Sequence, residues 1–221
     1  MHLLIKMIKC LIFDLDGTLV DTLKDLCVCT NEILKEYDYK EIEIDKFRHF
    51  AGNGIKKLME RCILASNGDL NLLDEIYFKF TINYENKCLR YAKLYTNIKE
   101  VLNILKDNKY LLFVNTNKNQ EIAEIIINNL LPNYFINIYG ICDKYPPKPN
   151  PYIINYISNE YSLKKEEIIY VGDSNVDVET AHNAFVKVIG CNYGFRGKEE
   201  LSSAGSDYQI DDPMEILKII K

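Results

Sequence analysis

The sequence CLIFDLDGTLVDT, residues 10–22, places a short apolar run directly before two aspartates that are separated by one residue. The stretch from Ile8 to Phe13 is apolar, brief and closed by Asp-x-Asp-Gly, which is the pattern of a buried strand that ends in a turn. Asp14 and Asp16 therefore stand at the tip of a buried segment. Carboxylates in such a place need a chemical partner, because burying an unpaired charge is costly.

Strand-like and helix-like patterns alternate along the chain after Tyr95. The strand-like runs are YLLFVNTN, FINIYGICD, EEIIYVGDS and KVIGCNYG, and the helix-like runs are IKEVLNILKDNK, NQEIAEIIINNL, PYIINYISNEY and VETAHNAF. This alternation predicts an α/β fold in which a parallel sheet carries helices on both faces.

The block between the first strand and this alternating region has helical patterns and no convincing strand, with turns at AGNG and SNGD. We expect an α/β core domain, which carries the catalysis, at residues 1–20 and 92–221. An inserted α-helical domain is expected at residues 21–91, with hinges near residues 20–22 and 91–95. A chain of 221 residues has room for one sizeable core and such an appendage.

The charge balance bears on the partners of the protein. Lys and Arg number 27 and Asp and Glu number 32, which gives a net charge of −5. The whole protein therefore does not attract a nucleic-acid backbone or an anionic membrane, and we expect neither as a partner. Lys6 and Lys9 interrupt the apolar N-terminus, and no segment approaches the ~18 uninterrupted apolar residues of a membrane span.

The seven cysteines are odd in number and scattered along the chain. Cys27 and Cys29 form the only close pair, and a C-x-C without a second pair or a nearby histidine indicates buried thiols rather than a metal site. Such use of cysteine fits a reducing compartment, so we expect a cytoplasmic protein.

Polar residues follow four of the expected strands, and ligands of open parallel sheets bind outside the carboxyl ends of the strands. The first strand is followed by Asp14, Asp16, Gly17 and Thr18, the second by Thr116, Asn117 and Lys118, the third by a loop with Lys148, and the fourth by Asp173, Ser174 and Asp177. Without a ligand, acidic groups and a lysine gathered at one edge of the sheet would repel one another or form the wrong ion pairs. A divalent cation bound to the carboxylates and a phosphate bound to the lysine would balance these charges.

The acidic residues suit phosphoryl transfer. Asp14 and Asp173 can supply oxygen ligands to Mg²⁺. Asp14 can also attack phosphorus to form an aspartyl phosphate, which divides one difficult hydrolysis into two easier steps. Asp16 can protonate the leaving oxygen and later activate water.

Neutral and basic residues complete the expected site. The backbone N–H groups of Gly17 and Thr18 near a helix N-terminus suit an anion. Thr116 and Asn117 add hydrogen-bond donors, and Lys148 opposes the charge that builds on the transferring group. Each motif alone is common in turns, caps or solvated loops, and their joint placement at four strand ends favours the functional interpretation.

Four motifs in this order, FDLDGTLVDT, VNTNK, KPNP and VGDSNVDVETA, resemble those of the haloacid dehalogenase-like hydrolase superfamily, and the match spans the whole expected core. AGNGIKKLMER, CNYGFRGKEEL and AGSDYQIDDPMEIL are similar to the phosphoglycolate phosphatase group within it. The resemblance implies a Rossmann-like core, a small α-helical cap formed by the insertion, Mg²⁺ as cofactor, and a small phosphorylated metabolite as substrate. Phosphoglycolate is the first candidate.

The resemblance also implies a role for each site residue. Asp14 is the expected nucleophile and Asp16 the expected acid/base, while Asp177 supports the site or orients Lys148. The expected metal ligands are Asp14, Asp16 and Asp173. The expected substrate-binding residues are Gly17, Thr18, Thr116, Asn117, Lys148, Asn53 and Gly54.

Two positions depart from the family pattern. Phe185 stands where the family often has glycine, and Asn115 occupies a strand position that is usually apolar or threonine. Neither touches the expected chemistry. The dehalogenases of the superfamily lack the second aspartate of the first motif, so the presence of Asp16 favours phosphate transfer over carbon–halogen cleavage.

Several other functions stay open at this point. An inorganic pyrophosphatase, a nucleotide or sugar phosphatase and a β-phosphoglucomutase fit the same motifs. A phospho-aspartate receiver is a remote alternative, because it needs an adjacent acidic pair on its first strand and Asp14 and Asp16 alternate. A calcium loop that starts at Asp14 is excluded, because Leu19 and Asp25 stand where it needs Gly and Glu.

The helical block and the assembly leave two further points open. The basic or amide residues of the block that could include a carboxylate-recognising group are Arg48, His49, Asn53, Lys56, Lys57 and Arg61. The protein could be a monomer or a homodimer.

Overall fold

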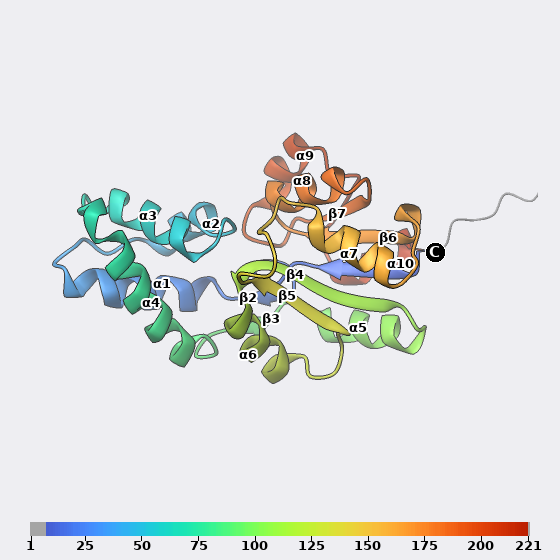
Figure 1. Ribbon diagram of the computed structural model, residues 1–221, viewed down its shortest axis with the longest axis horizontal. Helices are drawn as coiled ribbons and strands as arrows, with labels where there is room; N and C mark the ends of the chain where they lie inside the picture. The colour runs from blue at the N-terminus through green and yellow to red at the C-terminus, as the bar shows by residue number, and fades with distance from the viewer. Residues whose placement is uncertain (1–7, 221) are drawn as a thin grey trace, which may run out of the picture.

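The computed structural model describes residues 8–220, and a six-stranded sheet forms its centre (Figure 1). The strand order is β5-β4-β1-β6-β7-β8, and every neighbouring pair is parallel. The strands are β1 (Cys10–Phe13), β4 (Leu111–Asn119), β5 (Asn137–Ile141), β6 (Ile168–Gly172), β7 (Lys187–Cys191) and β8 (Tyr208–Ile210). The expected α/β fold with a parallel sheet is confirmed.

Helices cover both faces of this sheet, because successive apolar side chains of a strand point to opposite faces. In β1, Leu11 and Phe13 belong to one buried cluster, and Cys10 and Ile12 belong to another. The first cluster includes α5 (Ile98–Asp107) and α6 (Gln120–Leu130), and the second includes α7 (Tyr152–Glu160), α8 (Asn175–Asn183) and α9 (Gly197–Ala204). Figure 1 shows α5 and α6 on one side of the sheet and α7, α8 and α9 on the other.

Four helices form a bundle at one end of the molecule, between β1 and α5 in chain order (Figure 1). They are α1 (Leu23–Glu36), α2 (Ile44–Phe50), α3 (Ile55–Ala65) and α4 (Leu73–Lys87). Phe47, Met59 and Phe80 are fully buried and give the bundle an apolar centre. The domain bounds of 1–20, 21–91 and 92–221 stay a prediction, and residues 1–7 and 221 lie outside the described residues.

The chain crosses between the sheet and the bundle twice, and the two crossing segments pair with each other. β2 (Val20–Asp21) and β3 (Lys93–Leu94) form a two-stranded antiparallel sheet. Next to it, the N–H of Tyr95 donates to the carbonyl oxygen of Leu19 over 3.2 Å. The pair coincides with the two segments expected to act as hinges.

The sequence analysis assigned no element after residue 194, where the structure has several short ones. They are α9, β8, a 3₁₀ turn at Pro213–Glu215 and α10 (Ile216–Ile219), and two more 3₁₀ turns lie earlier at Leu70–Leu72 and Lys165–Glu167. The 3₁₀ turns, β8 and α10 have three or four residues each, which is too short for hydrophobic periodicity to reveal, and α9 buries only Leu201, so it shows no apolar stripe.

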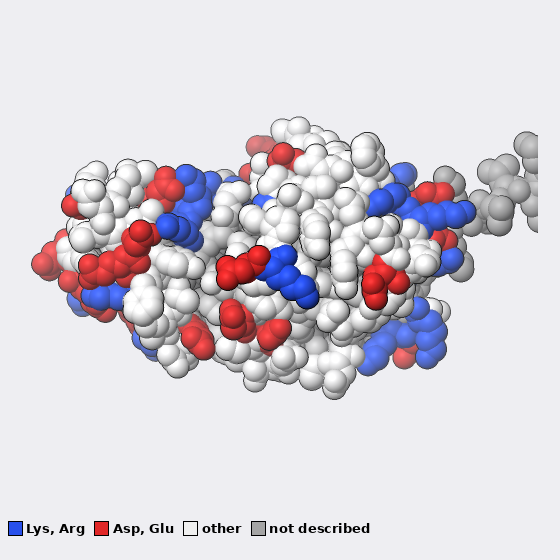
Figure 2. Space-filling view, in the orientation of Figure 1, with Lys and Arg blue, Asp and Glu red and all other residues white. Residues whose placement is uncertain are grey.

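Two surface properties bear on the expected partners. Within residues 8–220, no helix has both the length and the apolar character that crossing a membrane requires. Figure 2 shows basic and acidic side chains next to each other at both ends of the face in view. The charges on this face are therefore mixed rather than sorted by sign.

Candidate active site

The carboxyl ends of β1, β4 and β6 bring the predicted residues together, because these three strands are parallel neighbours. Asp14 directly follows β1, and Asp173 directly follows β6. Thr116 and Asn117 lie in the last part of β4. The parallel register therefore gathers at one edge groups that are up to 159 residues apart in the sequence, from Asp14 to Asp173.

Three buried carboxylates and one ammonium group form the centre of this edge. Oxygen atoms of Asp14, Asp173 and Asp177 lie within 4.8 Å of one another. Lys148 Nζ lies 2.8 Å from Asp14 Oδ1 and 2.6 Å from Asp177 Oδ1. The expectation that Asp177 orients Lys148 agrees with this contact.

Asp177 is held by the start of helix α8. Its Oδ2 accepts hydrogen bonds from the Ser174 N–H over 3.0 Å, from the Ser174 hydroxyl over 2.7 Å and from the Asp173 N–H over 3.2 Å. A carboxylate in the first helical turn satisfies N–H groups that have no partner in the helix and faces the positive end of the helix dipole. Asp177 is therefore fixed as a support for Lys148.

Two glycines let the chain approach Asp173 closely. A Cβ at Gly17 would lie 2.3 Å from Asp173 Oδ2, and a Cβ at Gly194 would lie 2.3 Å from Asp173 Cβ. Gly17 also has a φ of +83°, which strains other residues. Asp173 Oδ2 accepts a hydrogen bond from the N–H of Phe195 over 2.6 Å, so this close packing also orients the carboxylate.

The electrostatics of the cluster fit a divalent cation. Burial raises the pKa of Asp14 to about 7; Lys148 opposes this rise, and the charge of Asp177 adds to it. Burial, together with Asp177 and Asp14, raises the pKa of Asp173 well above its usual range. A hard cation that prefers carboxylate oxygens would favour the ionised forms of both groups. The residues present therefore suit a hard divalent cation such as Mg²⁺.

Asp16 turns its carboxylate away from this cluster and toward the bundle. Its Oδ1 accepts a hydrogen bond from the Thr22 hydroxyl over 2.5 Å, and its Oδ2 lies 3.0 Å from Lys118 Nζ. Lys118 Nζ in turn donates to the hydroxyl of Tyr84 in α4 over 3.1 Å. The side chain of Asp16 is thus placed for a role different from that of Asp14. The position of its carboxylate does not support the prediction that Asp16 is a metal ligand.

The turn after β1 differs from expectation in the direction of its N–H groups. The Gly17 N–H donates to Val20 O over 3.0 Å, and the Thr18 N–H donates to Leu15 O over 3.4 Å. Helix α1 begins only at Leu23. In this structure the turn uses both N–H groups internally, and their predicted contact with an anion stays a prediction.

The side chain of Asn117 makes contacts that the sequence did not predict. Its Oδ1 accepts a hydrogen bond from the Lys148 N–H over 2.8 Å, and its Nδ2 donates to Lys148 O over 3.1 Å. The same Nδ2 lies 3.1 Å from the carbonyl oxygen of Gly52 in the bundle. The Asn117 side chain therefore positions the backbone of Lys148 and touches the bundle, and its predicted role as a donor to a substrate stays a prediction.

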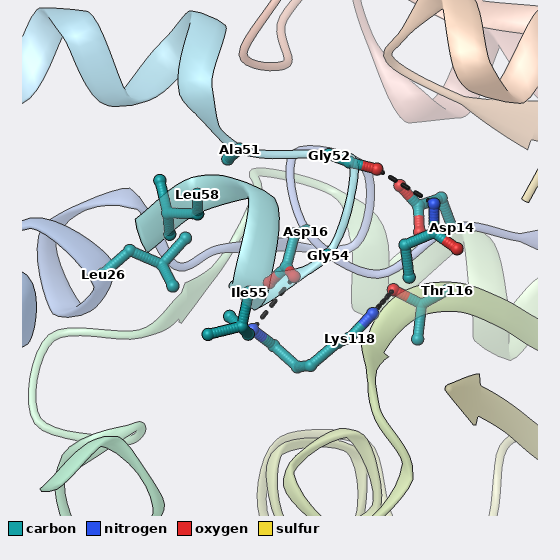
Figure 3. A pocket seen from close by; sticks show the side chains of 11 residues that line it. Asp14, Asp16, Leu26, Ala51, Gly52, Gly54, Ile55, Leu58, Thr116 and Lys118 are labelled. Atoms are coloured by element: carbon teal, nitrogen blue, oxygen red, sulfur yellow. Dashed lines mark hydrogen bonds and ion pairs between the residues drawn. The ribbon is translucent and has the colours of Figure 1, made fainter. Parts of the chain in front are cut away.

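A narrow pocket of about 30 Å³ lies between the sheet edge and the bundle (Figure 3). Its lining residues are Asp14, Asp16, Leu26, Ala51, Gly52, Gly54, Ile55, Leu58, Thr116, Asn117 and Lys118. Of the predicted bundle residues, Gly54 lines the pocket and Asn53 does not. Asn53 instead accepts a hydrogen bond from Arg61 over 2.9 Å on the outer side of the loop.

Three basic residues of the bundle, Lys56, Lys57 and Arg61, have partners away from the pocket. Lys56 pairs with Asp74 over 2.6 Å, and Lys57 pairs with Glu60 over 2.8 Å. Arg61 donates to Phe50 O over 2.6 Å. No basic residue of the bundle lies among the described residues that line the pocket.

The sequence analysis missed the functional placement of Lys118, which it recorded at a strand end without a role. Thr116 and Lys118 are two positions apart in β4, so their side chains share a side of the strand. This spacing could have indicated that Lys118 points to the same side as Thr116. The contact of Lys118 with Tyr84 could not be predicted from the sequence, because it depends on how the bundle packs on the sheet.

Three comparisons with known proteins agree with this geometry. Residues 11–191 match the family model described as haloacid dehalogenase-like hydrolase. The chain is 30% identical over 222 residues to a phosphoglycolate phosphatase of Vibrio parahaemolyticus serotype O3:K6, and the match covers 96% of each chain. The crystal structure of a predicted phosphoglycolate phosphatase from Haemophilus somnus 129PT has a TM-score of 0.89 and 28% identity, and covers 97% of this chain and 98% of its own.

A further solved structure has the same fold at lower identity. A protein from Lactobacillus delbrueckii subsp. bulgaricus has a TM-score of 0.91 at 22% identity, covering 97% of this chain and 98% of its own. At this identity the likeness concerns the fold alone. The whole described architecture, bundle included, therefore recurs in solved structures.

Proposed function

The chain belongs to the haloacid dehalogenase-like hydrolases, and from this premise we propose that it hydrolyses a small phosphomonoester through an aspartyl phosphate on Asp14. It is a phosphoric monoester hydrolase, with phosphoglycolate as the first candidate substrate. The observation that carries the mechanism is the position of Asp14, buried at the end of β1 and 2.8 Å from Lys148 Nζ.

Asp14 serves as the nucleophile in the first step. One of its carboxylate oxygens attacks phosphorus, the bond between phosphorus and the leaving oxygen breaks, and the phosphoryl group stays on Asp14. Lys148 lies beside the attacking carboxylate and opposes the negative charge of the transferring group. Asp177 holds Lys148 in this position.

Asp16 serves as the acid and base. It gives its proton to the leaving oxygen as that bond breaks, and in the second step it takes a proton from the water that attacks the aspartyl phosphate. These steps return Asp14 and Asp16 to their starting forms and release inorganic phosphate. Asp16 is suited to this task because its carboxylate lines the pocket outside the cluster of Asp14, Asp173 and Asp177.

Mg²⁺ is the proposed cofactor, held by Asp14 and Asp173. When bound, it supplies positive charge that screens the repulsion between the carboxylate nucleophile and the phosphate. Asp173 is oriented for this by the Phe195 N–H and by the close approach of Gly17.

The pocket supports a small substrate. The space open to a ligand is only about 30 Å³, well below the roughly 300–1,000 Å³ of ligand pockets, so the bundle has to move away from the sheet edge to admit a substrate. The walls contributed by Leu26, Ile55 and Leu58 are apolar. A two-carbon leaving group requires less opening of the bundle than a nucleoside, whose base and sugar need more room.

The decisive experiment is a screen of phosphorylated metabolites with the purified protein and Mg²⁺, ranked by kcat/KM. The panel includes phosphoglycolate, sugar phosphates, nucleotides, pyrophosphate and β-glucose 1-phosphate. We expect phosphate release, ranked highest for a small phosphomonoester and lost on addition of EDTA. A chain that releases no phosphate from any member, with its fold verified by circular dichroism, would contradict the proposal.

We also propose a cytoplasmic location. All seven cysteines are free thiols, and six of them are buried. Such thiols are typical of a reducing compartment. Oxidation of the purified protein should change its thiol count little, because burial protects these groups.

A further inference from the structure

A second hollow, of about 600 Å³, spans the bundle and the core on the outer side of the loop at residues 51–54. The bundle contributes His49, Asn53 and Arg61 to its lining, and the core contributes Asn175, Arg196 and Glu200. None of these residues lines the pocket of Figure 3, which the loop borders with Ala51, Gly52 and Gly54. The loop therefore separates two distinct spaces.

Two arginines, one from each side of the hollow, hold this loop. Arg61 donates from Nη1 to Phe50 O over 2.6 Å, and Arg196 donates from Nη2 to Ala51 O over 2.7 Å. Because the two carbonyl oxygens belong to consecutive residues, the closed position of the bundle brings two positive charges close together. Burial and the charge of Arg196 lower the pKa of Arg61, which agrees with this proximity.

The acidic groups near the hollow balance the charge of one arginine and not of the other. Glu200 lies 3.3 Å from Arg196 Nη1. Among the described residues, no carboxylate forms an ion pair with Arg61, and its sequence neighbour Glu60 pairs with Lys57 over 2.8 Å. The hollow therefore carries a positive charge that the protein leaves without an anionic partner on the described part of the chain.

The remaining polar groups of the hollow include several hydrogen-bond donors. Asn53 Oδ1 accepts a hydrogen bond from Arg61 Nη2 over 2.9 Å, which leaves the NH₂ group of Asn53 available. Within residues 8–220, the side chains of His49 and Asn175 have no hydrogen-bond or ion-pair partner. Donors around an unbalanced guanidinium group suit a ligand whose oxygen atoms accept hydrogen bonds and carry negative charge.

We propose that this hollow binds a small oxyanion, a phosphate or a carboxylate group, which Arg61 holds from the bundle and Arg196 holds from the core. The anion offsets the repulsion between the two guanidinium groups and stabilises the closed position of the bundle. It lowers KM for a phosphomonoester, because closure over the substrate becomes more favourable, and it does so from outside the pocket that holds Asp14. The effect on KM rests on the proposed function, whereas the binding of the anion does not.

The first test measures binding without any substrate. Isothermal titration calorimetry follows the addition of sodium sulfate, a tetrahedral oxyanion, and of sodium succinate, a dicarboxylate, to the purified protein at constant ionic strength. We expect saturable binding of at least one of them. Binding of sulfate alone assigns the site to phosphate groups, binding of succinate alone assigns it to carboxylates, and binding of both assigns it to their shared chemistry. The absence of saturable binding for both anions overturns the inference.

Two variants locate the anion. Arg61→Gln should raise Kd about 10–100-fold, the loss expected for one hydrogen bond to a charged group. Ser203→Glu, an exposed change at the edge of the hollow, keeps both arginines and should also weaken binding, because it adds a negative charge there. Lys57→Gln is the matched control: it changes the net charge by the same amount on the same helix as Arg61, and Lys57 does not line the hollow.

The outcome for the variants decides where the anion binds. If Arg61→Gln and Ser203→Glu keep the parent's Kd, the anion binds elsewhere and the inference is wrong. If Arg61→Gln does not fold, Ser203→Glu decides, because it leaves the hydrogen bonds between the arginines and the loop in place.

The second test measures the effect of the anion on hydrolysis of p-nitrophenyl phosphate. We expect the bound anion to lower KM of the parent and of Lys57→Gln roughly fivefold or more, and to leave KM of Arg61→Gln unchanged. An anion that only competes at Asp14 raises KM in all of these proteins, and that result, or an unchanged KM in the parent, overturns the bridging role. If the parent hydrolyses no ester, the proposed function fails, and calorimetry still decides whether the site exists.

Discussion

Arg196, in the loop after β7, donates from Nη2 to the carbonyl oxygen of Ala51 in the bundle over 2.7 Å. The side chain of Arg196 is 10% exposed and also lies 3.3 Å from Glu200. Together with the contact from Asn117 to Gly52, it holds the loop at residues 51–54 against the edge of the sheet. The position of this loop over the pocket therefore depends on the core as well as on the bundle.

Arg196→Ala should weaken the closed position of the bundle. A hydrogen bond to a charged group contributes about 1.5–3 kcal/mol, so we expect KM for a phosphomonoester to rise roughly tenfold or more. Steady-state kinetics measure the change. Lys46→Ala, an exposed change on α2, is the control and should leave KM unchanged. An Arg196→Ala enzyme with the parent's KM would show that this contact does not contribute to closure.

Asp16→Asn should distinguish esters by their leaving groups. General acid catalysis is worth roughly 10²–10⁴-fold, and an alkoxide needs it while p-nitrophenolate does not. The variant should lose far more activity toward phosphoglycolate than toward p-nitrophenyl phosphate in the first step. It should also accumulate aspartyl phosphate and release a burst of p-nitrophenol, which rapid-quench kinetics can measure. Equal losses for both esters would assign the proton to another group.

Asp173→Asn should raise the requirement for Mg²⁺. The carboxylate is buried, oriented by the Phe195 N–H and close to Asp14. Disturbing even an indirect partner of a metal site costs about 10–100-fold in affinity, so the Mg²⁺ concentration for half-maximal activity should rise at least tenfold. Glu121→Gln, an exposed change on α6, is the control. An unchanged requirement would remove Asp173 from the metal site.

The stability of the protein should depend on pH and Mg²⁺ together. Burial raises the pKa of Asp14 to about 7, so the folded state holds a proton that the unfolded state releases near pH 4. Without added Mg²⁺, the folded state should lose stability as the pH rises from about 4 to 7. Mg²⁺ favours the ionised form, so its effect on Tm should be larger at pH 8 than at pH 5.5. Thermal unfolding in EDTA and in Mg²⁺ at both pH values measures this, and a Mg²⁺ effect that shrinks with rising pH would contradict it.

Phe185→Gly should stabilise the protein. Phe185 has a φ of +60° and is 86% exposed, so it carries backbone strain and loses little packing when it is removed. The left-handed conformation costs about 1–2 kcal/mol for other residues, part of which the flexibility of glycine offsets. We expect Tm to rise by about 2–4 °C. Phe185→Ala retains the Cβ and should give no such gain, and an equal gain for both variants would rule out strain as the cause.

The sequence predicted the centre of the site because that part depends on local patterns. β1 and β6 are short, apolar and closed by acidic residues, so Asp14 and Asp173 could be placed at strand ends without any tertiary information. Parallel pairing then brings strand ends together. The sequence also showed that Phe185 stands where the family often has glycine. The structure explains the preference for glycine, because residue 185 has a positive φ.

The contacts between the bundle and the core could not be predicted in this way. Lys118 and Tyr84 are 34 residues apart, and Arg196 and Ala51 are 145 apart. Their meeting depends on the angle at which α4 and the loop at residues 51–54 pack on the sheet. Hydrophobic periodicity indicates which face of a helix is buried, but it does not indicate which element that face packs against.

The paired segments β2 and β3 determine how the bundle can move relative to the sheet. Two hydrogen-bonded strands form a ribbon that bends across its flat face more easily than it slides along its length, because sliding breaks its hydrogen bonds. We expect a bundle that swings on this ribbon to follow one arc and to return to the same register when it closes. The joint itself would then restore the alignment over the reacting phosphate, and Arg196 and Asn117 would have only to hold the position that the ribbon selects.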